Sequence, residues 1–139
     1  MKVYIAGKLR EKEELDELEQ VDSLCNSIGL DTFLPHRDVG LAEGPQDAKK
    51  IFEGDITKGF KDVKLVIALL DGFHVGAGTA WELGYAYSKG IPAIGLKTDE
   101  SIEDSFEYLS AILIGSMPIA TSMQELKTKL LHFKEHGRF

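Results

Sequence analysis

The sequence predicts an α/β fold, a doubly wound sheet of about five parallel strands with helices on both faces. Three observations support this prediction. Short apolar runs without polar alternation are typical of strands that are buried on both faces of a parallel sheet. Segments between these runs carry apolar residues at helical spacing. The connections are short and no linker or internal repeat interrupts the 139 residues, so we expect a single domain over 1–139.

The elements are expected in a regular order along the chain. Strands are expected at 3–6, 31–34, 65–70, 91–96 and 118–120. The helices expected between them cover an apolar stripe from Leu15 to Ile28 that includes Cys25, a second stripe from Ala48 to Phe60, and residues 79–88, 102–114 and 122 onward. Pro92 lies near the start of its strand, where a missing N–H does least harm.

Composition limits the classes of function. Sixteen Lys and Arg against 23 Asp and Glu give a formal net charge of -7, which repels nucleic-acid polymers and anionic membranes. An anionic ligand would therefore need a local basic cluster. The single cysteine, Cys25, excludes an internal disulfide and a cysteine metal cage. No run approaches the ~20 apolar residues of a membrane span and Met1-Lys2 leads directly into a strand, so we expect a soluble cytoplasmic protein without a signal peptide.

The ligand site is expected at the carboxyl ends of the strands, where the strand order reverses. If the first strand lies between the second and the third, the crevice lies between the turns at 7–10 and 71–78. Gly7 permits a sharp turn, and Lys8 and Arg10 then place two cations where a phosphate or carboxylate would bind. The alternative is that both are solvated and pair with the acidic residues at 11–14.

The segment from Gly76 to Gly84 holds the most informative residues. Gly76 and Gly78 allow close backbone approach to a ligand, ahead of a helix whose free N–H groups point at the crevice. Glu82 is expected in the first turn of this helix, where the macrodipole would lower its pKa and keep it ionised, as a nucleophile requires. The alternative is a capping box, in which Glu82 only bonds back to the backbone of Thr79.

Asp55 falls within the apolar stripe of its helix, three residues after Phe52 and four after Ile51. Burial there would raise its pKa, which is the profile of a general acid. The alternative is a structural carboxylate bonded to a neighbouring loop or to Arg37. Two carboxyls in different environments, one ionised and one held neutral, form the pair that breaks glycosidic bonds, and in a retaining mechanism they lie ~5 Å apart.

Two further residues are expected at the ligand edge. Asp71 ends the third strand, and it either binds a ligand hydroxyl or starts the Asp71-Gly72 turn. His36 follows Pro35 at the end of the second strand and points toward the same edge. No Ser-His-Asp arrangement, phosphate-loop motif or zinc-ligand spacing is present, so we expect neither a metal nor another cofactor.

These residues together resemble a known family. The chain is similar to the nucleoside 2-deoxyribosyltransferase superfamily, which includes the 2'-deoxynucleoside 5'-phosphate N-hydrolases, in Tyr4-Ile5-Ala6-Gly7, in Asp55 ahead of a strand, in Leu70-Asp71-Gly72 and in Gly78-Thr79-Ala80-Trp81-Glu82-Leu83-Gly84-Tyr85-Ala86. The resemblance implies a Rossmann-like fold, a Glu82 that forms a covalent 2-deoxyribosyl intermediate, an Asp55 near the reacting centre and a Tyr4 that orients Glu82. It also implies a homodimer or larger homo-oligomer whose sites are completed by a neighbouring subunit.

Within this family the resemblance separates two activities. Transferases that use free nucleosides usually carry an Asp six residues before the nucleophile and an Asn from the neighbouring subunit, where this chain has Gly76 and Ser110. The nucleotide hydrolases are more similar, with a Ser at the position of Ser110, an Arg at that of Arg10 to hold the 5'-phosphate, and a ligand-facing histidine at that of His36. Lys8 departs from the small polar residue usual in that branch.

We therefore expect an N-glycosidase of nucleotide salvage that acts on 2'-deoxyribonucleoside 5'-monophosphates and releases the free base and 2-deoxyribose 5-phosphate. Glu82 would attack C1', and a protonated Asp55 would assist departure of the base. Lys8, Arg10, Ser110 and the backbone of 76–78 would bind the phosphate. One alternative is a nucleoside 2-deoxyribosyltransferase that exchanges bases on free 2'-deoxynucleosides. The other is a non-catalytic nucleotide-binding module.

Overall fold

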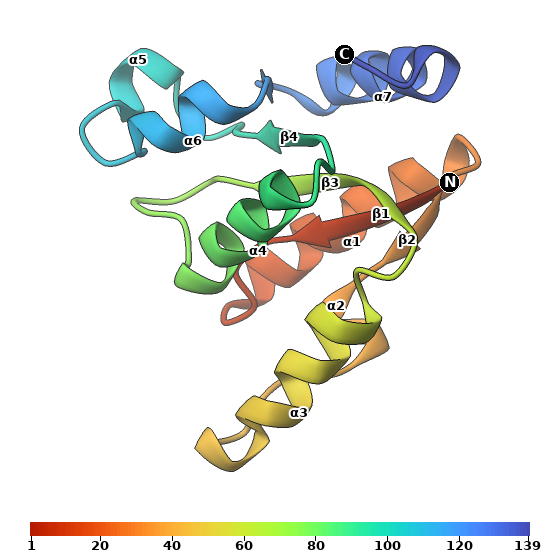
Figure 1. The fold of residues 1–139 in the computed structure, drawn as a ribbon. Helices are drawn as coiled ribbons and strands as arrows, with labels where there is room; N and C mark the ends of the chain where they lie inside the picture. The colour runs from red at the N-terminus through yellow and green to blue at the C-terminus, as the bar shows by residue number, and fades with distance from the viewer.

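A five-stranded parallel sheet forms the centre of the computed structural model, which describes residues 1–139 (Figure 1). The strands lie in the order β2-β1-β3-β4-β5. They are β1 (Lys2–Ala6), β2 (Asp31–Phe33), β3 (Val63–Leu69), β4 (Ala93–Leu96) and β5 (Ile119–Ala120). The predicted α/β fold is confirmed, as is the position of the first strand between the second and the third. The chain therefore reverses its direction of travel across the sheet between β1 and β3, which is where ligands of such sheets bind.

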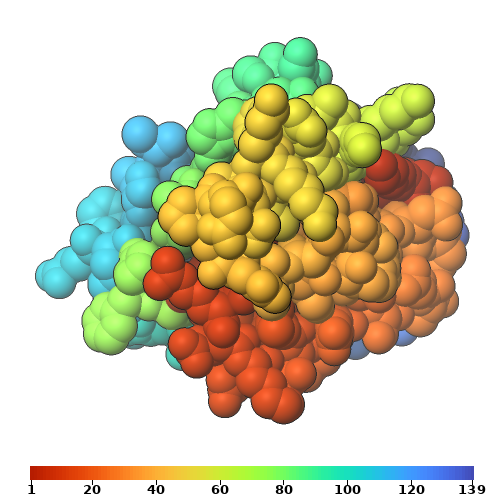
Figure 2. Space-filling model, turned by 90° about the horizontal axis from the view of Figure 1, so that it is seen from below, coloured from red at the N-terminus to blue at the C-terminus, as the bar shows by residue number.

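Six of the seven α-helices lie between strands along the chain, together with one 3-10 and one π-helical segment, and the seventh follows the last strand. They are α1 (Lys12–Ser27), α2 (Pro35–Asp38), η1 (Pro45–Asp47), α3 (Ala48–Phe52), η2 (Glu53–Lys58), α4 (Ala77–Ser88), α5 (Ile102–Ser105), α6 (Ala111–Ser116) and α7 (Met123–His136). In the space-filling view from below, the segment of α2 and α3, in yellow and orange, stands in front of the rest of the chain (Figure 2). None of the helices combines the length and apolar character needed to cross a membrane.

The apolar core divides into two layers, one on each face of the sheet. Alternate residues of β1 enter different layers: Val3 and Ile5 pack with α1 and α7, whereas Tyr4 and Ala6 pack with η2 and α4. Cys25 is buried in the first layer, as expected of a core residue. This alternation places the Tyr4 side chain beneath α4, on the face where the candidate catalytic residues lie.

The helix expected over residues 48–60 is two segments, and this expectation was wrong in detail. The five-residue α3 gives way to the π-helical η2, in which the Gly59 N–H donates to the Gly54 carbonyl at 2.9 Å, five residues back. Glycine supports an α-helix weakly, and π-helical turns occur often at functional sites. Asp55 lies inside this π-helical turn.

Two other helices differ from their expected bounds. The helix predicted over 102–114 is divided into α5 and α6, and Ser110 is the N-cap of α6, where its hydroxyl accepts a hydrogen bond from the Ile112 N–H at 3.2 Å. The cap satisfies an N–H group at the start of α6, which begins as a separate helix at Ala111, after α5 has ended at Ser105. The helix predicted over 79–88 begins earlier, at Ala77 after the N-cap Gly76.

Gly95 of β4 supports a test of this packing. A Cβ at this position would lie 2.6 Å from Leu70 Cδ1 and 3.2 Å from Ile119 Cγ1, so a methyl group there must displace core side chains. We expect Gly95→Ala to lower the free energy of unfolding by about 1–3 kcal/mol, measured by urea denaturation. The control is Gly115→Ala, since a Cβ at Gly115 meets nothing within 4 Å. Equal stability of the two variants would contradict the packing around β4.

Candidate active site

The centre of the candidate site is a hydrogen bond between β1 and α4. Tyr4 is fully buried, and its hydroxyl donates to Oε2 of Glu82, which is 78 residues away in the sequence. Burial and the neighbouring Glu82 raise the pKa of Tyr4 above its ordinary value, so the hydroxyl keeps its proton and remains a donor. Tyr4 and Glu82 thus come together as the resemblance implies.

Asp55 lies beside this pair on η2. Its side chain is buried with 8% exposure, and its Oδ1 has no hydrogen-bond partner. Burial raises its pKa to about 6. The expected burial of Asp55 is found in the structure. The alternative bond to Arg37 is wrong, because that guanidinium binds Asp22 and Asp38 instead.

The expectation that the helix dipole keeps Glu82 ionised was wrong. Burial raises the pKa of Glu82 to about 7, the bond from Tyr4 opposes this rise, and the charge of Asp55 adds to it. Because α4 begins at Ala77, Glu82 is its sixth residue, and the dipole acts mainly within the first turn. The capping box with Thr79 is also wrong, since the N-cap is Gly76 and the Glu82 carboxylate binds Tyr4.

Lys8 lies across the turn between β3 and α4. A Cβ on Gly72 would lie 2.4 Å from its Nζ, and a Cβ on Gly76 would lie 3.1 Å from its Cγ. The two glycines therefore leave the space that the lysine side chain occupies. A Cβ on Gly78 would meet nothing within 4 Å, so the first turn of α4 is open beside this residue. The turns after β1 and β3 are adjacent, as predicted.

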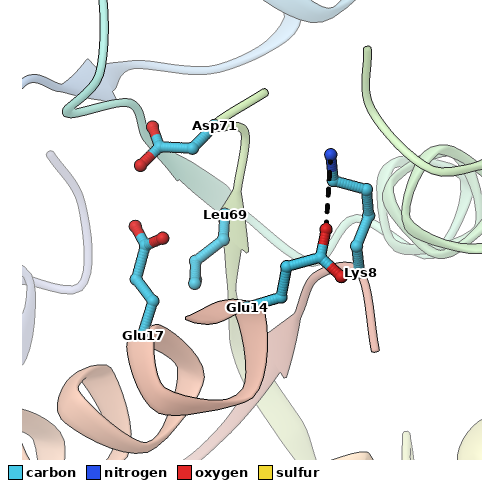
Figure 3. Close-up of a pocket in the computed structure, with 5 residues that line it drawn as sticks. All are labelled: Lys8, Glu14, Glu17, Leu69 and Asp71. Carbon is cyan, nitrogen blue, oxygen red and sulfur yellow. Dashed lines mark ion pairs between the residues drawn. The ribbon is translucent and has the colours of Figure 1, made fainter. Parts of the chain in front are cut away.

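Lys8 and three carboxylates line a small cavity at this edge (Figure 3). The cavity has a volume of about 30 Å³ and is lined by Lys8, Glu14, Glu17, Leu69 and Asp71. Lys8 Nζ lies 3.5 Å from Glu14 Oε2, so the expected pairing with the acidic run is found for Lys8. The carboxylates of Glu17 and Asp71 face each other, and burial followed by the charge of Asp71 raises the pKa of Glu17 to about 7. Sequence reasoning missed Glu17.

The start of the β3–α4 turn is anchored to the end of β4. Both carboxylate oxygens of Asp71 accept hydrogen bonds from Thr98: Oδ1 from its N–H at 2.7 Å and Oδ2 from its hydroxyl at 2.8 Å. In return, the Gly72 N–H donates to Asp99 Oδ2 at 2.8 Å. Asp99 also binds Nζ of the buried Lys97 at 2.7 Å. The turn is therefore held in place, and Gly72 adopts a φ of 100° that favours glycine.

The remaining predicted residues make no hydrogen bond to Tyr4, Glu82 or Asp55. Arg10 is exposed, and its guanidinium has no hydrogen bond or ion pair within the chain. His36 lies on α2 with Nε2 3.2 Å from Glu19 Oε1 on α1. Ser110 caps α6 on the exposed surface. Gly7 packs against Leu18, where a Cβ would lie 3.0 Å from Cδ2.

Comparison with known proteins identifies the family. The model of the nucleoside 2-deoxyribosyltransferase family matches residues 3–113. The chain belongs to this family. Its members are enzymes that act on N-glycosidic bonds of deoxynucleosides. No curated protein sequence matches the chain.

Solved structures support the same fold. A conserved protein from Enterococcus faecalis V583 matches with a TM-score of 0.74 and 27% identity, over 94% of this chain and 97% of that one. A 2-deoxyribosyltransferase from Bacillus psychrosaccharolyticus matches with a TM-score of 0.73 and 20% identity, over 91% of this chain and 90% of that one. At that identity the second match shows the shared fold alone.

The raised pKa of Glu82 predicts a change in stability with pH. Folding raises this pKa from 4.5 to about 7, so the unfolded chain ionises first and the free energy of unfolding falls as pH rises through this window. Glu82→Gln removes that loss. We measure the free energy of unfolding of both proteins by urea denaturation at pH 4 and at pH 8. The difference, variant minus wild type, should be larger at pH 8 than at pH 4 by about 1–3 kcal/mol. The exposed Glu107→Gln is the control. A difference that does not change with pH would contradict the burial of Glu82.

Proposed function

We propose that this family member hydrolyses the N-glycosidic bond of 2'-deoxyribonucleoside 5'-monophosphates through a covalent intermediate on Glu82. The observation that carries the proposal is the group of Tyr4, Glu82 and Asp55. Two carboxyls titrate near neutral pH in this group, and a buried tyrosine hydroxyl binds one of them. Titratable groups with shifted pKa values in a ligand crevice are typical of acid–base and nucleophilic chemistry.

The reaction requires an ionised Glu82 and a protonated Asp55. Because the pKa of Asp55, about 6, lies below that of Glu82, about 7, the proton shared by the two carboxyls must move to Asp55 before the base departs. A Glu82 oxygen forms a bond to C1' while the bond from C1' to the base nitrogen breaks, and Asp55 gives its proton to the departing base. Water then attacks C1' and breaks the ester, and the ionised Asp55 takes a proton from that water. The Tyr4 hydroxyl favours the ionised form of Glu82, because its hydrogen bond lowers the pKa that burial raises.

Cations near the turns support a phosphate group at the 5' end. Lys8 lies against Gly72 and Gly76, and the guanidinium of Arg10 is free to bind an anion. The N-terminus of α4 presents unbonded N–H groups at the same edge, beside the open position at Gly78. Where transferases that use free nucleosides usually carry an Asp, this chain has Gly76, which adds no negative charge there.

Base exchange on free deoxynucleosides is the second candidate. The observation that favours it is the set of three carboxylates that line the cavity with Lys8, from Glu14, Glu17 and Asp71, which opposes the approach of a phosphate. The catalytic steps are shared up to the covalent intermediate, after which a second base instead of water takes the sugar. The two functions therefore differ in the acceptor and in the 5' end of the substrate.

A homo-oligomer in the cytoplasm is part of the proposal. The surface around Ser110 carries Phe106 at 64% exposure and Ile112 at 81% exposure. Exposed apolar side chains beside a polar candidate residue are typical of a surface that another subunit covers. In the proposed assembly, Ser110 reaches the phosphate in a neighbouring site.

The reaction is tested with dGMP and with deoxyguanosine, each with and without free adenine. We expect release of guanine from dGMP and no transfer of deoxyribose to adenine. Because Glu82 and Asp55 perform the chemistry, Glu82→Gln and Asp55→Asn should lose at least about 100-fold in kcat, and Glu135→Gln, at an exposed position on α7, should not. Mass spectrometry of the quenched wild type should find a deoxyribosyl adduct on Glu82.

Other outcomes of this assay identify the alternatives. Turnover of deoxyguanosine only, with adenine captured, would establish base exchange and contradict hydrolysis of monophosphates. Binding of dGMP without turnover of either substrate and without an adduct would establish a non-catalytic nucleotide-binding module.

The phosphate contacts are tested separately with Lys8→Met and Arg10→Ala. Methionine keeps the apolar stem of Lys8 over the glycine turn and removes the charge. A charge-assisted contact is worth about 1.5–3 kcal/mol, so we expect each variant to raise KM for dGMP by about 10- to 100-fold and to leave kcat near the wild-type value. Lys12→Ala is the matched control, since Lys12 is exposed on the neighbouring turn of α1. An unchanged KM in both variants would contradict the assigned phosphate site.

A further inference from the structure

We propose that Phe60 and Phe33 are positioning residues that hold the Tyr4 hydroxyl on the Glu82 carboxylate; the inference rests on the proposed role of Glu82 as nucleophile. Neither phenylalanine is among the residues that the sequence pattern assigns to the site. They act through Tyr4 and not on the substrate.

Both rings stack on the ring of Tyr4. The Phe60 centroid lies 4.2 Å from that of Tyr4 with 25° between the planes, and the Phe33 centroid lies 5.2 Å away with 19° between the planes. Phe33 is directly opposite Tyr4 in the parallel register of β1 and β2, and Phe60 follows the end of η2. The Tyr4 ring is therefore fixed by neighbours from two different elements.

These contacts form a closed loop through the helix that carries the nucleophile. Phe60 packs edge-on against Tyr85 of α4, with centroids 5.0 Å apart and 75° between the planes. Tyr85 lies one helical turn after Glu82 on α4. Glu82 in turn accepts the hydrogen bond from Tyr4, so the chain of contacts ends at the residue where it began. A shift of Phe60 must therefore change the position of Tyr4 relative to α4.

The other ring is held where glycine leaves room. A Cβ on Gly59 would lie 2.7 Å from Phe33 Cε1, so this ring occupies the space where a side chain would be. Lys2 Nζ lies 5.4 Å from the centre of the same ring. The segment from Asp55 to Phe60 thus supplies both the proposed general acid and the contacts that fix the proposed orienting tyrosine.

The Tyr4 hydroxyl has Glu82 as its single hydrogen-bond partner, so packing of the ring sets the position of the oxygen. The tyrosine oxygen lies on the axis of χ2, so its position depends on χ1, and the rings of Phe33 and Phe60 stacked on Tyr4 restrict that rotation. The titratable groups facing the Glu82 carboxyl are the neutral hydroxyl of Tyr4 from β1 and the carboxyl of Asp55 from η2. Phe33 lies on β2, outside the segment that carries Asp55, so loss of its ring would weaken the donor without altering that segment, and the ionised form of Glu82 would be less favoured.

The test compares Phe60→Leu and Phe33→Leu with Phe133→Leu. Phe133 is a buried aromatic residue on α7 in the opposite layer, so its variant reports a general loss of core packing. We expect the first two to lower kcat for dGMP by about 10- to 100-fold with KM within about threefold of wild type. Phe133→Leu should keep kcat near the wild-type value even where it lowers Tm as much as the other two variants do. Phe33→Tyr retains the stacked ring and should restore kcat.

A second measurement does not depend on turnover. The Glu82 carboxyl is titrated by carbon-13 NMR in the resting protein, with Glu82→Gln to assign the signal and Tyr4→Phe to mark complete loss of the donor. Phe60→Leu and Phe33→Leu should move the Glu82 titration to higher pH, toward that of Tyr4→Phe, and Phe133→Leu should not. If both variants titrate as the wild type does, the inference is overturned. A wild type without any turnover, with the titration shifted as expected, would overturn the proposed function and leave the positioning role intact.

Discussion

The hydrogen bond from the Tyr4 hydroxyl to Glu82 joins the centre of the sheet to the helix above it, and the arrangement of the active site depends on it. Tyr4 lies on β1, which pairs with β2 on one side and β3 on the other, so its backbone cannot shift without breaking two ladders. Glu82 lies on α4, whose Leu83 and Ala86 pack on the same face of the sheet. The bond therefore places a carboxylate oxygen at a fixed position over the sheet, as a preorganised nucleophile requires.

Burial gives the two carboxyls of the site their chemical character. In water both would be ionised at neutral pH, whereas here the pKa of Asp55 rises to about 6 and that of Glu82 to about 7. Only Glu82 has a hydrogen-bond donor, because Oδ1 of Asp55 is buried without a partner. An unpartnered buried carboxyl reduces stability, and in the proposed reaction it gains the ability to hold and release a proton near pH 7.

The fold could be predicted largely from the sequence, because its signals are local and repeated. Apolar runs without alternation indicated a parallel sheet, and helical stripes between them indicated the covering layers. The predicted helix bounds that were wrong lie where local hydrogen bonds divide a segment. A hydrogen bond from the Gly59 N–H to the Gly54 carbonyl belongs to the π-helical η2 that follows α3, and Ser110 caps a separate α6 within a segment whose pattern favoured one helix.

The sequence by itself determined the fold class, the crevice between two turns, and the burial of Asp55, since each follows from the spacing of apolar residues and glycines. Tertiary structure decided the state of Glu82. A helix that begins at Ala77 moves Glu82 beyond the reach of the dipole, and a partner 78 residues away replaces the expected capping contact. The stacking of Phe33 and Phe60 on Tyr4 was equally beyond the sequence, because it depends on strand register and on the packing of distant segments, which spacing along the chain does not specify.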